Sequence, residues 1–155
     1  ITGRNMLLWD GACHVHEKFS VEKILELKKQ YPDAKVLVHP ECKGTVVKLA
    51  DKVGSTAALL KYSISDSSDT FIVATERGIL HALQTARPEQ TFIPAPPTAS
   101  TCACTEASYT KLHTMQKLYD CLKNEAPEIH VDAQVAEKAI VSINRMLEIS
   151  DKLGL

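Results

Sequence analysis

The sequence has few aromatic residues, no excess of either charge and no long apolar run. Aromatic residues make up 5% of its 155 residues, too few for the stacking platforms of proteins that bind single-stranded nucleic acid. The 18 basic and 19 acidic residues leave a formal net charge of -1, which predicts no basic patch for nucleic acid. The apolar runs are far shorter than the roughly 20 residues of a membrane-spanning helix. We therefore expect neither nucleic acid nor a membrane as a partner.

The amino-terminal apolar run, Met6–Trp9, is too short for the hydrophobic core of a secretory signal, so we expect a cytoplasmic location. The chain starts at Ile1 without a methionine, and we interpret it as part of a longer protein. In a reducing compartment an odd number of cysteines does not predict structural disulfides. The thiols are then buried apolar groups, a catalytic group or metal ligands, and they are Cys13, Cys42, Cys102, Cys104 and Cys121.

Strand-like and helix-like patterns alternate between residues 5 and 94. Short apolar runs predict buried strands at 6–9, 35–39, 71–74 and 91–93. Helical patterns, some with a capping Ser or Thr in front, predict helices at 21–30, 45–53, from 56 onward, and at 77–86. Strands joined by helices at such spacings are typical of parallel sheets. We expect an α/β fold, a three-layer α/β/α domain with a short parallel sheet.

The alternation stops at a proline-rich stretch, residues 94–99, which predicts a linker or an exposed loop. A polar, cysteine-bearing segment and two helical segments follow, and the last helix, at 132–149, has one apolar stripe. Cys121 lies within a helical pattern and is expected in a core. We divide the chain into 1–12, the end of a preceding domain, 13–100, the α/β/α domain, and 101–155, a cysteine-bearing loop with C-terminal helices.

Ligands bind parallel α/β sheets beyond the carboxyl ends of the strands, and polar residues gather there. Cys13, close to His14 and His16, follows the first predicted strand. A metal site is one interpretation, and a simple loop thiol is the other, because ligands so close in sequence cannot complete a tetrahedral site alone. Cys102 and Cys104 are too close together for a Cys-x-x-Cys knuckle and are a weak signal.

His39 is the last residue of the second predicted strand and Glu41 follows it, and Thr75 follows the third. On an extended segment, the spacing of His39 and Glu41 puts both on one face, which favours a shared pocket. The alternative is a strand-end histidine beside a solvated carboxylate. Ser55 and Thr56 offer hydroxyls and N–H groups at a helix start, which suit an anion or serve only as a cap.

Four motifs, in this order along the chain, resemble those of the quinolinate synthase family. They are Gly11-Ala12-Cys13-His14-Val15-His16-Glu17-Lys18-Phe19, Val38-His39-Pro40-Glu41-Cys42, Ala50-Asp51-Lys52-Val53-Gly54-Ser55-Thr56 and Phe71-Ile72-Val73-Ala74-Thr75-Glu76-Arg77-Gly78. The tail Lys111-Leu112-His113-Thr114-Met115, followed by Lys117-Leu118, continues the resemblance, which covers nearly the whole chain.

The resemblance implies an enzyme that condenses iminoaspartate with dihydroxyacetone phosphate to quinolinate, in NAD biosynthesis. Family members have three similar α/β/α domains around a pseudo-threefold axis. A [4Fe–4S] cluster at their junction is held by one cysteine per domain, and its open iron acts as a Lewis acid. The implied partners are the two substrates, the other half of the same protein, and L-aspartate oxidase as the source of iminoaspartate.

Carried over residue by residue, the resemblance makes Cys13 the middle cluster ligand. It assigns His39 to substrate binding and Glu41 to substrate binding and general acid/base catalysis, because an imine condensation with dehydration needs proton transfer. Thr56, with Ser55 beside it, matches the hydroxyl that holds a substrate carboxylate or phosphate. His16 matches a histidine close to the cluster.

The sequence departs from the family at two points. The family's first half, with one cluster cysteine, is absent, so the residues 101–155 are expected to pack on a first domain outside this chain. In addition, alignment on Lys111-Leu112-His113-Thr114 places the third cluster cysteine at Ala107, which cannot bind iron. Cys104 is the nearest substitute, and Cys102 is the second choice.

We favour a quinolinate synthase with Cys13 and Cys104 as cluster ligands. One alternative is a non-catalytic relative that has lost the cluster through Ala107 and acts as a binding or partner module. Another is an unrelated α/β module that binds zinc through Cys13, His16 and a distant cysteine.

Overall fold

The computed structural model describes residues 5, 7, 9–99 and 106–154. The chain divides into two compact units, one that ends at Leu112 and one that begins at His113. The first unit contains the sheet and the second contains two helices, and each is described by itself.

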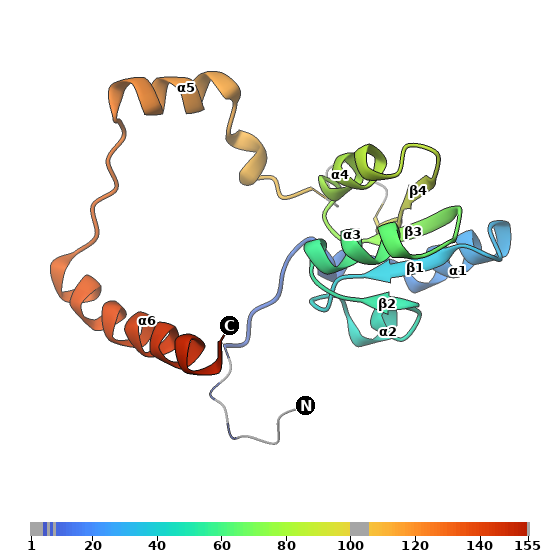
Figure 1. The fold of residues 1–155 in the computed structure, drawn as a ribbon, viewed down its shortest axis with the longest axis horizontal. Coiled ribbons are helices and arrows are strands. Elements are labelled where there is room, and N and C mark those ends of the chain that lie inside the picture. Colours follow the sequence, from blue (N-terminus) through green and yellow to red (C-terminus); the bar gives the residue numbers. More distant parts are fainter. Residues whose placement is uncertain (1–4, 6, 8, 100–105, 155) are drawn as a thin grey trace. The chain divides into compact units, whose positions relative to one another are not determined.

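The first unit is built on a parallel sheet, as the sequence predicts, and the sheet has four strands. Spatially, the strands follow the order β2-β1-β3-β4 (Figure 1). All three neighbouring pairs are parallel, and β1 pairs with β3 over its whole length, from Lys35 opposite Phe71 to Val38 opposite Ala74. The strands are β1 (Lys35–Val38), β2 (Lys52–Val53), β3 (Thr70–Ala74) and β4 (Thr91–Pro94).

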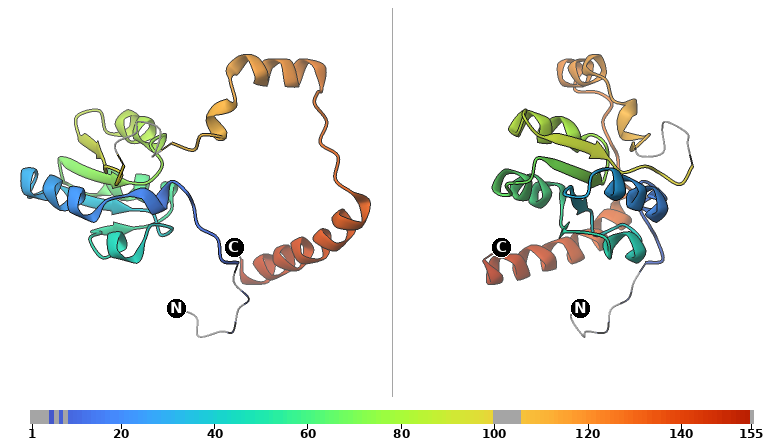
Figure 2. Two further views of the ribbon diagram at one scale, coloured as in Figure 1. Left: turned by 180° about the vertical axis from the view of Figure 1, so that it is seen from behind. Right: turned by 90° about the vertical axis from the view of Figure 1, so that its right-hand side faces the viewer.

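Helices cover both faces of this sheet, which makes the three-layer α/β/α fold expected from the sequence (Figure 2). Because successive strand residues point to opposite faces, Val36 and Val38 pack towards α1 and α2, whereas Leu37 packs towards α3 and α4. A strand buried on both faces has no polar alternation, which explains the continuous apolar runs. The helices are α1 (Val21–Gln30), α2 (Gly44–Val47), α3 (Thr56–Ser65) and α4 (Ile79–Ala86).

Two predicted elements are wrong. The described residues of the run 6–9 lie outside any strand, and Leu7 and Trp9 are exposed. An apolar run becomes a strand only where another strand supplies hydrogen bonds, and none of the described strands pairs with this run. The helix predicted at 45–53 ends at Val47, and the chain then forms β2, whose two residues are too few to leave a periodic signal.

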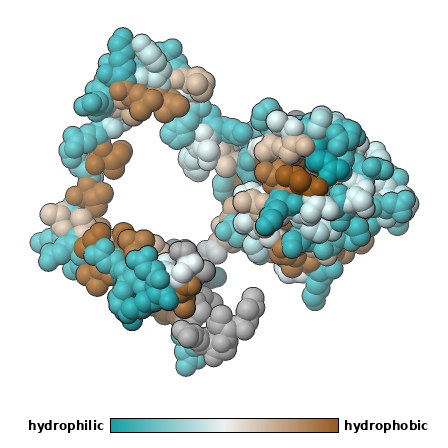
Figure 3. Space-filling view, viewed as in Figure 1, coloured by the Kyte–Doolittle hydropathy of each residue, from teal (hydrophilic) through white to brown (hydrophobic). Residues whose placement is uncertain are grey.

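The second unit consists of α5 (Met115–Asn124) and α6 (Ala133–Leu153), joined by an extended segment. The apolar stripe predicted on the last helix is present, but it is exposed, and α5 also exposes apolar residues (Figure 3). Cys121, expected in a core, is exposed on α5, because no described element of this unit covers that helix. The exposed apolar residues of α6 are Val135, Ile140, Val141, Ile143, Met146, Leu147, Ile149 and Leu153. Within the described part of the chain, no helix combines the length and the apolar character needed to cross a bilayer.

Replacement of Gly54 by alanine should destabilise the first unit, because a Cβ there would lie 2.9 Å from Cβ of Ala58 in the first turn of α3. Overpacking of this kind costs about 1–3 kcal/mol in the free energy of unfolding, which a denaturant titration measures. Gly44→Ala is the matched control, because a Cβ at Gly44 meets no atom within 4 Å. Equal stability of the two variants would contradict this close approach.

Candidate functional site

The candidate site lies at the carboxyl edge of the sheet, where β1 and β3 end side by side. Val38 of β1 lies opposite Ala74 of β3. The backbone pairing extends one residue beyond the strands, because the His39 N–H donates to the Ala74 carbonyl at 3.1 Å. His39 and Thr75, the next residues of the two strands, are therefore neighbours. This is the edge at which parallel sheets bind ligands.

A segment far away in the sequence reaches the same edge. The short 3₁₀ helix η1 (His16–Lys18) is followed by Phe19, which forms an antiparallel bridge with Pro97 beyond the end of β4. Backbone bonds from Ser20 N–H to Pro96 O (3.1 Å) and from Thr98 N–H to Lys18 O (2.7 Å) complete the anchor. The proline-rich stretch predicted as a linker or exposed loop is therefore in part a fixed partner of the residues after Cys13, and Ala95 within it is buried.

His16 is held at the centre of the site. It is 7% exposed, and its Nε2 forms a buried hydrogen bond of 3.0 Å with Thr75 Oγ1. Its ring stacks on that of His39, with centroids 4.2 Å apart and an angle of 14° between the planes. Its other nitrogen, Nδ1, lies 3.2 Å from Glu41 Oε2. One buried imidazole thus contacts the residues that follow both β1 and β3.

Glu41 brings a solvent-accessible carboxylate to this group, with its side chain 57% exposed. The Glu41 N–H donates to His39 Nδ1 at 3.3 Å. Because Nδ1 of His39 accepts that bond, the neutral ring carries its proton on Nε2, which is then a donor for a ligand. The pair predicted to share a pocket therefore lies together, with one donor and one proton-accepting group.

Burial lowers the pKa of His16 below its ordinary value of 6.5, and the neighbouring His39 lowers it further. The Glu41 carboxylate acts in the opposite direction but does not compensate. His16 is therefore neutral at pH 7, and a neutral imidazole offers a lone pair to a proton or a metal.

Two cysteines of the first unit have different environments. Cys13 is half-buried, and its Sγ lies within 4.8 Å of ligand atoms of His16 and Glu41. Cys42 is packed in the core between the sheet and α2, and its thiol donates to the Ala74 carbonyl at 3.4 Å. Burial raises the pKa of Cys42 to about 11, so this thiol is inert at neutral pH.

An iron–sulfur cluster needs thiolates, and among the described residues of this edge Cys13 supplies one. Ala107 is half-buried and has no ligand atom. Cys102 and Cys104 lie outside the described residues. The described residues of this edge therefore fit one cluster ligand, Cys13.

Ser55 and Thr56 lie at the end of β2, the strand on the other side of β1. The Gly54 N–H donates to the Val38 carbonyl at 3.1 Å. This bond holds the chain at the carboxyl end of β1, so α3, which begins two residues later, has its N-terminus at the same edge of the sheet. Ser55 Oγ accepts the Ala58 N–H at 3.3 Å, so this hydroxyl caps the helix, while both residues remain exposed.

Thr75 is the site residue to which the sequence assigned no role. The signal was present, since Thr75 directly follows the apolar run of a predicted strand. Its contact with His16 depends on how the distant segment after Cys13 is anchored, which a local pattern does not reveal.

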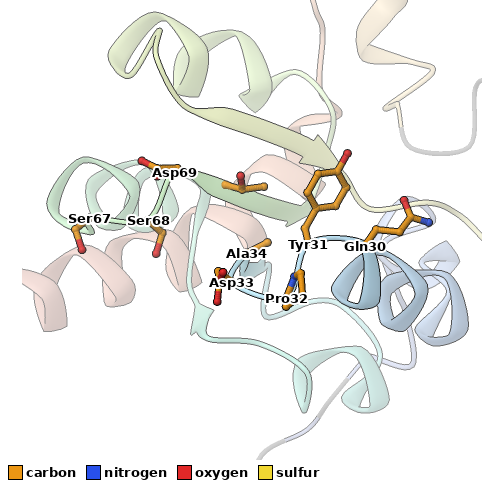
Figure 4. Close-up of a pocket in the computed structure, with 9 residues that line it drawn as sticks. Gln30, Tyr31, Pro32, Asp33, Ala34, Ser67, Ser68 and Asp69 are labelled. Carbon is orange, nitrogen blue, oxygen red and sulfur yellow. The ribbon is translucent and has the colours of Figure 1, made fainter.

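The opposite edge of the sheet carries a pocket of about 410 Å³ (Figure 4). This volume is typical of ligand-binding pockets, so the size of the pocket alone does not decide whether it is the functional site. It is lined by the loops that enter β1 and β3, residues 30–34 and 67–70, at the amino ends of the strands. Parallel sheets bind ligands at the other end, so we place the functional site at His16, His39 and Glu41.

Comparison with known proteins gives one consistent result. The family model described as "Quinolinate synthetase A protein" matches residues 1–148. The quinolinate synthase of Microcystis aeruginosa is 51% identical over 149 residues, which are 96% of this chain and 46% of the relative. Those of Thermosynechococcus vestitus and Chloroherpeton thalassium are 50% and 49% identical, over 96% of this chain and 47% and 46% of the relatives. The chain thus spans about half the length of the curated relatives it matches.

The pKa of His16, followed by the NMR signals of its ring, should lie below 6.5. Glu41→Gln should lower it further, because the carboxylate that favours the charged ring is removed. The unfolded chain then binds a proton that the folded chain does not, so the stability contributed by neutral His16 is complete above pH 6.5 and is lost as the pH falls towards the folded pKa. A His16 pKa at or above 6.5 would contradict the buried, neutral ring.

Proposed function

Because the chain belongs to the quinolinate synthase family, we propose that it forms about half of an enzyme that condenses iminoaspartate with dihydroxyacetone phosphate to quinolinate. The observation that carries the proposal is the convergence of Cys13, His16, His39 and Glu41 at the carboxyl edge of the sheet. The product feeds NAD biosynthesis, and we place the enzyme in the cytoplasm.

His39 and Glu41 have different roles towards the substrate: His39 binds it and Glu41 transfers protons. His39 Nε2–H donates a hydrogen bond to a substrate oxygen, since Nδ1 is occupied by the Glu41 N–H. The exposed Glu41 carboxylate takes and returns protons during imine formation and loss of water, and His16 Nδ1 at 3.2 Å keeps it oriented.

The N-terminus of α3 is a second anchoring point on the same edge. Ser55 is committed to its helix cap, which leaves the Thr56 hydroxyl and the first N–H groups of α3 for a substrate carboxylate or phosphate. The positive end of the helix dipole favours such an anion.

We propose a [4Fe–4S] cluster as the cofactor, held by Cys13, by Cys104 and by a cysteine of the other half of the protein. When bound, its open iron supplies Lewis-acid polarisation of a substrate oxygen or nitrogen. Cys102 is the second choice for the ligand from the loop.

The exposed apolar residues of α5 and α6 indicate a further partner, the other half of the protein. The apolar stripes of α5 and α6 need a cover, and we propose that residues 101–155 pack on a first domain in the other half of the protein, within a pseudo-threefold arrangement of three domains. Residues 1–12 are the end of the preceding domain and 13–100 are the third domain. Iminoaspartate is supplied by L-aspartate oxidase.

One observation favours a second candidate function. By the resemblance, Ala107 stands at the position of a cluster cysteine, so a chain in which neither Cys104 nor Cys102 replaces it would have no cluster. Such a protein would keep the fold and the substrate pocket and act as a binding or partner module.

Iron and acid-labile sulfide distinguish the two candidates. The full-length protein, purified without oxygen and reconstituted, should contain about four of each per chain, the composition of a [4Fe–4S] cluster. Cys13→Ser and Cys104→Ser should each remove the cluster, whereas Cys121→Ser, on exposed α5, should leave it. Iron and sulfide near zero after reconstitution would refute the enzyme proposal and favour the binding module.

Glu41→Gln in the full-length protein tests the acid/base role. The amide keeps the size of the side chain but takes no proton, so turnover should fall about 10²- to 10⁴-fold while the iron and sulfide content stays unchanged. Quinolinate formation measures the first quantity, and metal analysis measures the second. Near-normal turnover would remove Glu41 from the proton-transfer step.

A further inference from the structure

The chain that leaves β4 is held to the start of α1 through its carbonyl groups. Pro96 and Pro97 have no backbone N–H, so at these positions the chain offers only hydrogen-bond acceptors. The Pro96 carbonyl accepts the Ser20 N–H at 3.1 Å. The next two carbonyls, of Pro97 and Thr98, accept from the Lys23 ammonium at 2.8 and 3.4 Å. We call these two ammonium bonds the Lys23 clamp.

The stability of α1 does not explain the position of Lys23. This residue lies in the first turn, where the positive end of the helix dipole disfavours a cation. Lys28, in the last turn, lies at the favourable end, and its ammonium donates to the carbonyls of Pro32 and Ala34 at 3.0 and 2.6 Å. Both lysines are half-buried. The bonds of Lys23 therefore serve a segment that lies 74 residues further along the chain.

The segment bound by Lys23 holds, in turn, the residues that precede α1. Thr98 donates twice to the Lys18 carbonyl, from its N–H at 2.7 Å and from its hydroxyl at 3.1 Å. Lys18 ends η1, where the Glu17 N–H donates to the Cys13 carbonyl at 3.1 Å and the Lys18 N–H donates to the Val15 carbonyl at 3.3 Å. The bonds of Thr98 therefore fix the end of the turn that begins at Cys13.

This turn is held from one side. The described residues before Cys13 are exposed and form no helix or strand, so they do not fix it. A segment of this kind opens locally, at a free-energy cost that its remaining contacts set. Phe19 is packed in the core, and replacement of Lys23 leaves it there. Local opening of the turn, with the sheet intact, is therefore the expected result of losing the clamp.

We propose that Lys23 is a positioning residue of the candidate site. Its ammonium binds the chain that leaves β4 to α1, and that chain holds Cys13 and His16 at the carboxyl edge of the sheet. Lys23 acts through the backbone of residues 97–98 and of Lys18, since its ammonium donates to that chain. The inference rests on the proposed function, because it concerns the geometry of the proposed cluster ligand and of the histidine beside Glu41.

The test compares Lys23→Met with Lys28→Met in the reduced, metal-free full-length protein. Each change removes a half-buried ammonium that bonds two carbonyls and leaves an apolar side chain on α1. Lys23→Met should raise the amide hydrogen-exchange rates of Glu17 and Lys18 about tenfold, the effect of losing one hydrogen bond to a charged group. The alkylation rate of the Cys13 thiol should rise to a similar extent. Lys28→Met should leave all these rates at the parent values.

Two further measurements separate positioning from general stabilisation. Lys23→Arg should restore the parent rates, because a guanidinium also donates to carbonyls. The amides of Leu37 and Val38 in β1 should exchange at the parent rate in every variant. Equal Glu17 exchange in Lys23→Met and Lys28→Met would overturn the proposal. An equal rise in β1 would also overturn it, because Lys23 would then stabilise the fold as a whole.

Iron analysis distinguishes failure of this inference from failure of the proposed function. In the cluster-loaded full-length protein, Lys23→Met should lose iron to a ferrous chelator about tenfold faster than Lys28→Met, because the same hydrogen bond holds the proposed ligand Cys13. Equal rates of iron loss would overturn the role of the clamp at the site. A parent protein without iron and sulfide would refute the proposed function, and the exchange and alkylation rates would still decide the role of Lys23.

Discussion

The site depends on the parallel pairing of β1 with β3. Its register sets Val38 opposite Ala74, and the next backbone bond, from His39 N–H to the Ala74 carbonyl, fixes the chain just beyond the strands. A slip of one residue would turn His39 to the other face and bury a polar ring among the apolar residues packed on the sheet. The apolar runs that specify this register for packing therefore also fix where the chemistry is placed.

A second constraint brings the amino-terminal segment to that edge. Phe19 bridges Pro97, and the backbone bonds on either side hold residues 18–20 against the chain that leaves β4. His16, one turn earlier, is thereby placed on Thr75 and stacked on His39. Phe19 is also buried in the core cluster that contains Val36 and Ile72, so the anchor of the amino-terminal segment and the packing of the sheet depend on each other.

The elements that the sequence predicts correctly are those with a local pattern of apolar residues or a helix cap. Helix α1 follows from its Ser20 cap and apolar spacing, and β1 and β3 follow from apolar runs that fill both faces of the sheet. Strand β2 is too short to leave a pattern, and the run at 6–9 has the composition of a strand but no described partner. The shared face of His39 and Glu41 was predictable from their spacing. The contact between His16 and Thr75 was not, because it spans 59 residues and depends on the bridge at Phe19.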